Sequence, residues 1–189
     1  MKILSAEFIK SIVGEDEILD DGIPQVTFIG RSNVGKSSVI NSLVGRRDLA
    51  HSSATAGRTK QINFFFINKN FYLVDLPGYG FAVHSLAIRK ELRRLIFWYL
   101  LHANVDQKKV VLIIDAKVGP TDDDLEMLRR LEDNNKNILV VANKIDKVKK
   151  TELVKQLRNI AEFIGPHKII PYSATEKIGV EELIKEITG

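Results

Sequence analysis

Short, continuously apolar runs alternate along the chain with longer stretches in which apolar side chains recur every three or four residues. The short runs are typical of parallel strands buried on both faces, and the longer stretches are typical of helices. Their alternation predicts an α/β fold with a mostly parallel sheet and helices on both faces. The strand-like runs are residues 25–29, 61–67, 71–75, 110–115, 137–142 and 168–171, and the helical stretches are residues 38–44, 85–102, 121–131, 151–164 and 180–187.

Two of the strand-like runs, residues 61–67 and 71–75, are separated only by the polar residues 68–70. So short a connection predicts an antiparallel hairpin, which places one antiparallel strand at the edge of a six-stranded sheet. The consecutive phenylalanines at 64–66 alternate between the faces of a strand. We expect one or two of the rings in the core and Phe65 exposed.

Residues 1–22 follow the pattern less clearly. Residues 3–9 can form an added edge strand, and the acidic residues after them predict a loop. We treat residues 1–22 as an N-terminal extension and residues 23–189 as a single domain, which is long enough for one full α/β core.

The chain has no cysteine, which excludes disulfides and cysteine-based metal sites and fits a reducing compartment. Glu7 interrupts the N-terminal apolar stretch, and no later apolar run approaches the roughly 18 residues that span a bilayer. We therefore predict a cytoplasmic, monomeric protein without a membrane partner.

The formal net charge is +4, and many basic residues are clustered. A well-solvated surface and a nucleic-acid partner are both compatible with this charge, and the clustering modestly favours RNA or another acidic partner. The clusters are Arg58 and Lys60; Arg89, Lys90, Arg93 and Arg94; Lys108 and Lys109; and Lys147, Lys149 and Lys150.

Residues 30–37 have the pattern Gly-x-x-x-x-Gly-Lys-Ser between a predicted strand and a predicted helix. In this context the pattern predicts a phosphate-binding loop, whose main-chain N–H groups point at phosphate oxygens near the positive end of a helix. Lys36 is expected to contact the β- and γ-phosphates, and the Ser37 hydroxyl to bind Mg²⁺. The residues expected to bind nucleotide here are Gly30, Arg31, Ser32, Asn33, Val34, Gly35, Lys36, Ser37 and Ser38.

Residues 143–146, Asn-Lys-Ile-Asp, directly follow a predicted strand, where a base-reading loop is expected. The Asp146 carboxylate can accept hydrogen bonds from N1–H and the exocyclic amine of guanine, and adenine offers no such pair. GTP is therefore favoured over ATP. We expect Asn143 to brace loops and the stem of Lys144 to cover the base. A second base loop, with the Ala174 N–H facing guanine O6, is expected at Tyr172, Ser173 and Ala174.

Residues 75–78, Asp-Leu-Pro-Gly, begin at the last residue of the second hairpin strand and continue beyond it. A carboxylate at this place can hold Mg²⁺ through water, and the N–H of the glycine can sense the γ-phosphate. The residues of this segment expected to contact nucleotide or metal are Asp75, Leu76, Pro77 and Gly78.

The phosphate loop, Asp-Leu-Pro-Gly, Asn-Lys-Ile-Asp and Ser-Ala follow one another along the chain in an order that resembles the Ras-like GTPases over nearly the whole chain. The finer match, in residues 30–38, 57–59, 62–65 and 75–80, resembles the EngB/YihA/YsxC family, bacterial GTPases linked to assembly of the large ribosomal subunit. The resemblance implies a Ras-like GTP-binding domain with GTP or GDP and Mg²⁺ as its ligands.

The resemblance also implies a switch loop that ends at Thr59, whose hydroxyl joins Ser37 and Asp75 on Mg²⁺ when the γ-phosphate is present. Lys36, Thr59 and Gly78 are then the residues expected to act in hydrolysis. The switch-loop residues implied to contact the nucleotide are Gly57, Arg58 and Thr59.

Three positions depart from related proteins. Ala56 replaces a proline usual in the family, which leaves the switch loop less constrained, and Asn143 replaces a common threonine. Tyr79 stands where Ras-type enzymes have the glutamine that orients the attacking water. We therefore predict slow intrinsic hydrolysis that a partner stimulates, because a missing charge-stabilising group can be worth about 10³ to 10⁵ in rate.

Asn33 has two interpretations. Related GTPases use an asparagine here to coordinate K⁺ in place of an arginine finger, and an asparagine can equally shape the loop.

Two functional hypotheses stay open. In one, GTP turnover itself is the output. In the other, which we favour, GTP orders residues 45–59 and 78–84 so that a basic face docks on the large ribosomal subunit or its precursor, through rRNA and a ribosomal protein. A switch acting on a non-ribosomal protein or a membrane system is the remaining alternative.

Overall fold

One sheet of seven strands, in the order β1-β3-β4-β2-β5-β6-β7, organises the chain. The computed structural model describes residues 2–50, 61–80, 85–103 and 105–189. The strands are β1 (Ala6–Ile12), β2 (Gln25–Gly30), β3 (Ile62–Ile67), β4 (Phe71–Asp75), β5 (Gln107–Asp115), β6 (Ile138–Asn143) and β7 (Ile169–Pro171).

Helices and helical turns connect these strands. The α-helices are α1 (Lys36–Leu43), α2 (Leu86–Phe97), α3 (Asp122–Asp133), α4 (Lys150–Ile164) and α5 (Val180–Thr188). The short turns are the 3₁₀ turns η1 (Glu17–Leu19) and η3 (Ile145–Lys147) and the π-helical turn η2 (Trp98–His102). Within the described ranges, no helix has the length and apolar character to cross a membrane.

The pairing confirms a mostly parallel sheet. Strand β2 pairs in parallel with β4 and β5, and β5, β6 and β7 continue in parallel. Strand β3 is antiparallel to β4, and β1 is antiparallel to β3. The sheet has seven strands rather than the expected six because the N-terminal residues add β1. The edge position expected for the hairpin is therefore taken by β1, and β3 lies one strand inside it.

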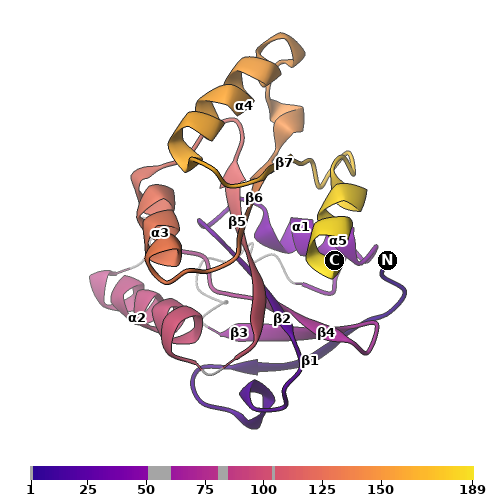
Figure 1. The fold of residues 1–189 in the computed structure, drawn as a ribbon, viewed down its shortest axis with the longest axis vertical. Helices are drawn as coiled ribbons and strands as arrows, with labels where there is room; N and C mark the ends of the chain where they lie inside the picture. The colour runs from indigo at the N-terminus through magenta and orange to yellow at the C-terminus, as the bar shows by residue number, and fades with distance from the viewer. Residues whose placement is uncertain (1, 51–60, 81–84, 104) are drawn as a thin grey trace.

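Helices cover both faces of the sheet, as the alternation predicted (Figure 1). One face packs against α2, α3 and α4 through side chains such as Ile96, Leu131 and Ile160. The other packs against α1 and α5 through side chains such as Ile40 and Leu183. Strand β2 is buried along its whole length because it lies between both layers at the centre of the sheet.

The phenylalanines of β3 differ from expectation. Phe65 is 2% exposed and Phe64 fully buried, whereas Phe66 is only partly buried. The expected exposure of Phe65 is wrong because its ring belongs to the core beneath α1 and α5 and meets Phe8 of β1, with ring centroids 5.8 Å apart.

Parallel pairing brings the carboxyl ends of several strands to one edge of the sheet. The phosphate-loop pattern begins at the end of β2, Asp75 ends β4, and Asn143 ends β6. Ligands of open α/β sheets bind at this edge, so the fold gathers motifs that lie more than a hundred residues apart in sequence.

Replacing Phe64 by alanine should strongly destabilise the fold. Its ring meets Tyr72 and Tyr99 edge-on, with centroids 5.7 and 6.3 Å away. We expect the free energy of unfolding, measured by urea denaturation, to fall by about 3–5 kcal/mol. The control is Phe163→Ala in α4, where the ring is 62% exposed and the expected change is within about 0.5 kcal/mol. Equal losses in the two variants would contradict this account of the core.

Candidate functional site

Two glycines shape the phosphate loop between β2 and α1. A Cβ on Gly30 would lie 2.6 Å from the carbonyl oxygen of Ile113, and a Cβ on Gly35 would lie 2.5 Å from Nδ2 of Asn143. Gly35 also has φ of +94°, in the left-handed region, and it caps the N-terminus of α1. The loop can therefore approach β5 and the last residue of β6 only because both positions lack a side chain.

The base-loop residues brace the phosphate loop directly. Nδ2 of Asn143 donates to the carbonyl of Val34 at 2.9 Å, and Nζ of Lys144 donates to the carbonyl of Asn33 at 2.6 Å. Asn33 itself has φ of +65°, a conformation that asparagine tolerates better than most residues. The expected bracing by Asn143 is thus a geometric feature of the fold, and Lys144 takes part in it.

Lys36 and Asp75 form a buried ion pair at the mouth of the loop. Their side chains are only 9% and 2% exposed. Each charge is compensated by the other, as buried charges require. An ammonium beside a carboxylate at the N-terminus of a helix fits a triphosphate with its divalent cation, since the first can bind phosphate oxygens and the second a metal or its water.

Other residues of the predicted site differ in how far their side chains are buried. The side chains of Val34 and Leu76 are buried in the core, 2% and 0% exposed, so they hold the loops in place from below. Ser37 lies in the first turn of α1, and the Ser38 side chain is exposed beside it. The predicted switch-loop residues Gly57, Arg58 and Thr59 lie outside the described residues.

The segment after β4 runs alongside the phosphate loop. The N–H of Leu76 donates to the carbonyl of Phe28 at 3.1 Å, and the N–H of Ser32 donates to the carbonyl of Tyr79 at 2.8 Å. A Cβ on Gly78 would lie 3.0 Å from Oγ and 3.2 Å from Cα of Ser32. Gly78 therefore packs main chain against main chain, next to the place expected for the γ-phosphate.

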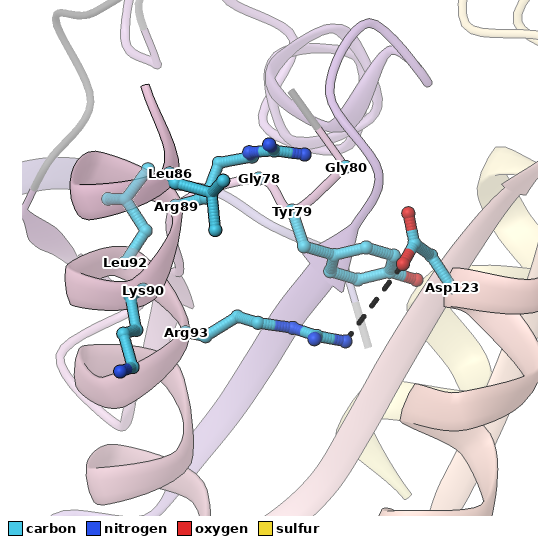
Figure 2. Close-up of a pocket in the computed structure, with 9 residues that line it drawn as sticks. All are labelled: Gly78, Tyr79, Gly80, Leu86, Arg89, Lys90, Leu92, Arg93 and Asp123. Carbon is cyan, nitrogen blue, oxygen red and sulfur yellow. Dashed lines mark ion pairs between the residues drawn. The ribbon is translucent and has the colours of Figure 1, made fainter. Parts of the chain in front are cut away.

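Tyr79 points away from this loop and toward α3 (Figure 2). Its hydroxyl donates to Oδ1 of Asp124 at 2.7 Å, and both side chains are buried. Burial, and then the nearby Asp124 carboxylate, raise the pKa of Tyr79 well above its usual value. The phenol therefore stays protonated at neutral pH and cannot act as a general base.

The guanine-reading residues also meet. Oδ1 of Asp146 accepts a hydrogen bond from Oγ of Ser173 at 2.7 Å, and Oδ2 lies 3.3 Å from Nζ of Lys147. The Ser173 hydroxyl, and to a lesser extent Lys147, lower the pKa of Asp146, so its carboxylate is an acceptor at neutral pH. The N–H of Ala174 donates to Oδ1 of Asn143 at 3.4 Å.

Tyr172 takes a different place from its neighbours in the second base loop. Its side chain is fully buried, and its hydroxyl shares a hydrogen bond of 2.6 Å with Oγ of Ser42 in α1. The N–H of Ile145 donates to the Tyr172 carbonyl at 3.1 Å. Tyr172 thus joins the two base loops and α1 from below.

Two residues of the site were not predicted from the sequence. Asp115, at the end of β5, accepts a hydrogen bond from Nζ of Lys144 at 2.8 Å. Asp124 binds Tyr79 and also belongs to a capping box with Thr121. The Thr-x-x-Asp spacing of this box is visible in the sequence, but its link to residue 79 depends on the fold.

A pocket of about 310 Å³ opens beside Tyr79 between the start of α2 and α3 (Figure 2). Arg93 lies 3.9 Å from Asp123 and also pairs with Glu126 of α3. Arg89 and Lys90 are exposed, and among the described residues neither has an ion pair. The pocket is lined by Gly78, Tyr79, Gly80, Leu86, Arg89, Lys90, Leu92, Arg93 and Asp123.

Two family models match the sequence. The model described as 50S ribosome-binding GTPase matches residues 25–144, which contain the phosphate loop, residues 75–78 and the first two residues of the first base loop. The model of the elongation factor Tu GTP binding domain matches residues 103–189.

Similar proteins cover nearly the whole chain. The probable GTP-binding protein EngB of Clostridium perfringens strain 13 is 44% identical over 97% of this chain and 94% of its own length. The EngB of Caldanaerobacter subterraneus subsp. tengcongensis is 41% identical over 98% of this chain and 96% of its own.

Solved structures share the fold. The crystal structure of a probable GTP-binding protein engB superposes with a TM-score of 0.73, at 26% identity, over 87% of this chain and 96% of that one. The structure of Era with MgGDPNP and nucleotides 1506–1542 of 16S ribosomal RNA superposes with a TM-score of 0.66, at 24% identity, over 88% of this chain and 56% of that one. With the relatives in sequence, these findings show that the chain belongs to the EngB family of GTP-binding proteins and is a GTPase of the P-loop class.

Proposed function

We propose that this GTPase is a slow, GTP-gated switch that acts in the cytoplasm in assembly of the large ribosomal subunit. The observation that carries the proposal is the convergence of the phosphate loop, Asp75, Gly78 and the Asp146 loop at one edge of the sheet, beside an exposed basic pocket wall. The family model's description as a 50S ribosome-binding GTPase supports the choice of partner.

Each motif takes a defined part in this proposal. Main-chain N–H groups of residues 30–38 bind the phosphates, and Lys36 neutralises the β- and γ-phosphates. Ser37, Thr59 and Asp75 would hold Mg²⁺, which when bound neutralises charge that develops on the phosphate oxygens. Lys36 and Asp75 pair with each other in the described conformation. We infer that nucleotide binding gives each a new partner of opposite charge.

Slow hydrolysis follows from the placement of Tyr79. Its side chain is directed at Asp124 and leaves no polar group at residue 79 to orient an attacking water. Lys36, the Gly78 N–H and Thr59 then supply the stabilisation that the chain itself provides. A partner, K⁺ or both supply the remaining stabilisation, so the rate of GTP hydrolysis rises when they bind.

Asp146→Asn should change the preferred base. An asparagine amide can accept from N1–H but offers an N–H₂ group where guanine also offers one, so GDP affinity should fall by about 10²- to 10⁴-fold. Xanthosine diphosphate, with a carbonyl at this position, should gain affinity. Calorimetric titration of both nucleotides measures the change in base preference. Asp133→Asn at the exposed end of α3 is the control for the lost charge. An unchanged preference for guanine would remove Asp146 from base recognition.

Hydrolysis should be faster in KCl than in NaCl at equal ionic strength if Asn33 helps to coordinate K⁺. Asn33→Gly separates this role from loop shaping, because glycine adopts a φ of +65° without strain yet lacks the amide. We expect the variant to bind GDP normally and to lose the difference between the two salts, measured by phosphate release. Equal wild-type rates in both salts would leave Asn33 with a loop-shaping role alone.

Co-sedimentation with purified large ribosomal subunits tests the partner. Binding should be stronger with a non-hydrolysable GTP analogue than with GDP and should weaken steeply with salt, since phosphate contacts release counterions. Arg89→Glu/Lys90→Glu should weaken binding, whereas Lys155→Glu/Arg158→Glu on exposed α4 positions makes the same charge change elsewhere. Absence of binding in every nucleotide state, with nucleotide affinity intact, would exclude the large subunit and leave a non-ribosomal partner.

A further inference from the structure

A buried hydrogen bond connects the segment after β4 to the first turn of α3. The hydroxyl of Tyr79 donates to Oδ1 of Asp124 at 2.7 Å, and the two residues are 5% and 2% exposed. This side chain is the one that replaces the water-orienting glutamine of Ras-type enzymes. Its hydroxyl is nevertheless fully engaged within the protein, which calls for a role other than proton transfer.

Asp124 is itself fixed. Its Oδ2 accepts from the N–H of Thr121 at 2.9 Å and from Oγ1 of Thr121 at 2.7 Å, the arrangement of a helix capping box. Both carboxylate oxygens are therefore bonded, and a buried carboxylate is costly to leave with a missing donor. The Tyr79 ring is thus tied to a rigid point at the start of α3.

The main chain of Tyr79 is tied to the phosphate loop at the same time. Its carbonyl accepts from the N–H of Ser32 at 2.8 Å and from Oγ of Ser32 at 3.0 Å. Its N–H donates to the carbonyl of Gly30 at 3.3 Å. One residue therefore joins the phosphate loop, the segment after β4 and α3.

Both neighbours of Tyr79 are glycines. Gly80 has φ of +72°, and neither Gly78 nor Gly80 has a side chain that could hold this stretch. Glycine has the largest conformational freedom of any residue, so the position of the Gly78 N–H depends on what anchors Tyr79. The Leu76 side chain anchors the start of the segment in the core, and the Tyr79 phenol is the side chain that holds the stretch after Gly78 to another element.

We propose that Tyr79 is a positioning residue for the γ-phosphate. Its hydrogen bond to Asp124 holds the Gly78 N–H at a fixed place beside the phosphate loop. The inference rests on the proposed contact of Gly78 with the γ-phosphate. Because GDP has no γ-phosphate, its affinity does not depend on this anchor, whereas the affinity for GTP and the rate of hydrolysis do.

Tyr79→Phe tests the proposal, since it removes the hydroxyl and keeps the ring. We expect the affinity for a non-hydrolysable GTP analogue to fall by about fivefold, the equivalent of one hydrogen bond, while GDP affinity stays within about twofold. The kcat for GTP should fall with the analogue affinity. The matched control is Tyr72→Phe, which loses a similar bond, from the Tyr72 hydroxyl to Asp21 at 2.8 Å, at the opposite end of β4. Its ratio of analogue to GDP affinity should equal that of the wild type.

Two further variants separate positioning from stability. Thr121→Ala removes the Oγ1 bond and lowers the melting temperature, but the N–H of residue 121 and the Tyr79 hydroxyl still hold Asp124, so the affinity ratio should not change. If Tyr79→Phe fails to fold, Tyr79→Phe/Asp124→Leu removes both polar partners and avoids an unpaired carboxylate. The same fivefold change in ratio is expected from it.

An unchanged ratio in Tyr79→Phe, or an equal loss of affinity for both nucleotides, would overturn the proposal. Gly78→Ala, measured in parallel, shows which part has failed. The added Cβ would press on Ser32 and displace the N–H, so it should lower analogue affinity selectively. If Gly78→Ala is selective and Tyr79→Phe is not, the anchoring role fails and the Gly78 contact stands. If neither is selective, the contact of Gly78 with the γ-phosphate fails as well.

Discussion

The site depends on glycines whose bare main chain lets neighbouring segments come into direct contact with it. At Gly30, Gly35 and Gly78, an added Cβ would lie between 2.5 and 3.0 Å from an atom of another segment. These contacts bring the end of β2, the segment after β4 and the end of β6 close enough to share hydrogen bonds. Phosphate recognition by N–H groups needs the same bare backbone, so packing and ligand binding impose one requirement on the same residues.

The pairing of the strands also brings the charged residues of the site together. Lys36 and Asp75 are brought together in the core by the parallel pairing of β2 with β4, and Lys144 reaches Asp115 because β5 and β6 end side by side. A buried pair of this kind contributes little net stability, because desolvation offsets the attraction between the charges. Its effect is to hold both side chains at the place where a charged ligand binds.

Much of this was accessible from the sequence. Periodicity located the strands and helices, because parallel strands buried on both faces have unbroken apolar runs, as in residues 110–115. Motif spacing located the nucleotide edge. The sequence could not show that Asp124 receives the Tyr79 hydroxyl or that Asp115 receives Lys144, since these contacts join residues that only the folded sheet brings together. The burial of Phe65 was missed for a similar reason: alternation tells which residues share a face, but not that β1 and two helices cover that face.

Strand β1 forms one of the two edges of the sheet. It pairs with β3 along its length, and Asn68 holds the residues before it by accepting from the N–H groups of Leu4 and Ser5 at 2.7 and 3.0 Å. Without β1, the unpaired N–H and carbonyl groups of the phenylalanine-rich β3 would form the edge, which is the kind of apolar strand that recruits another chain. The N-terminal residues therefore cover an edge that would otherwise favour pairing with another chain, and Glu7, Lys10 and Ser11 give the new edge polar side chains.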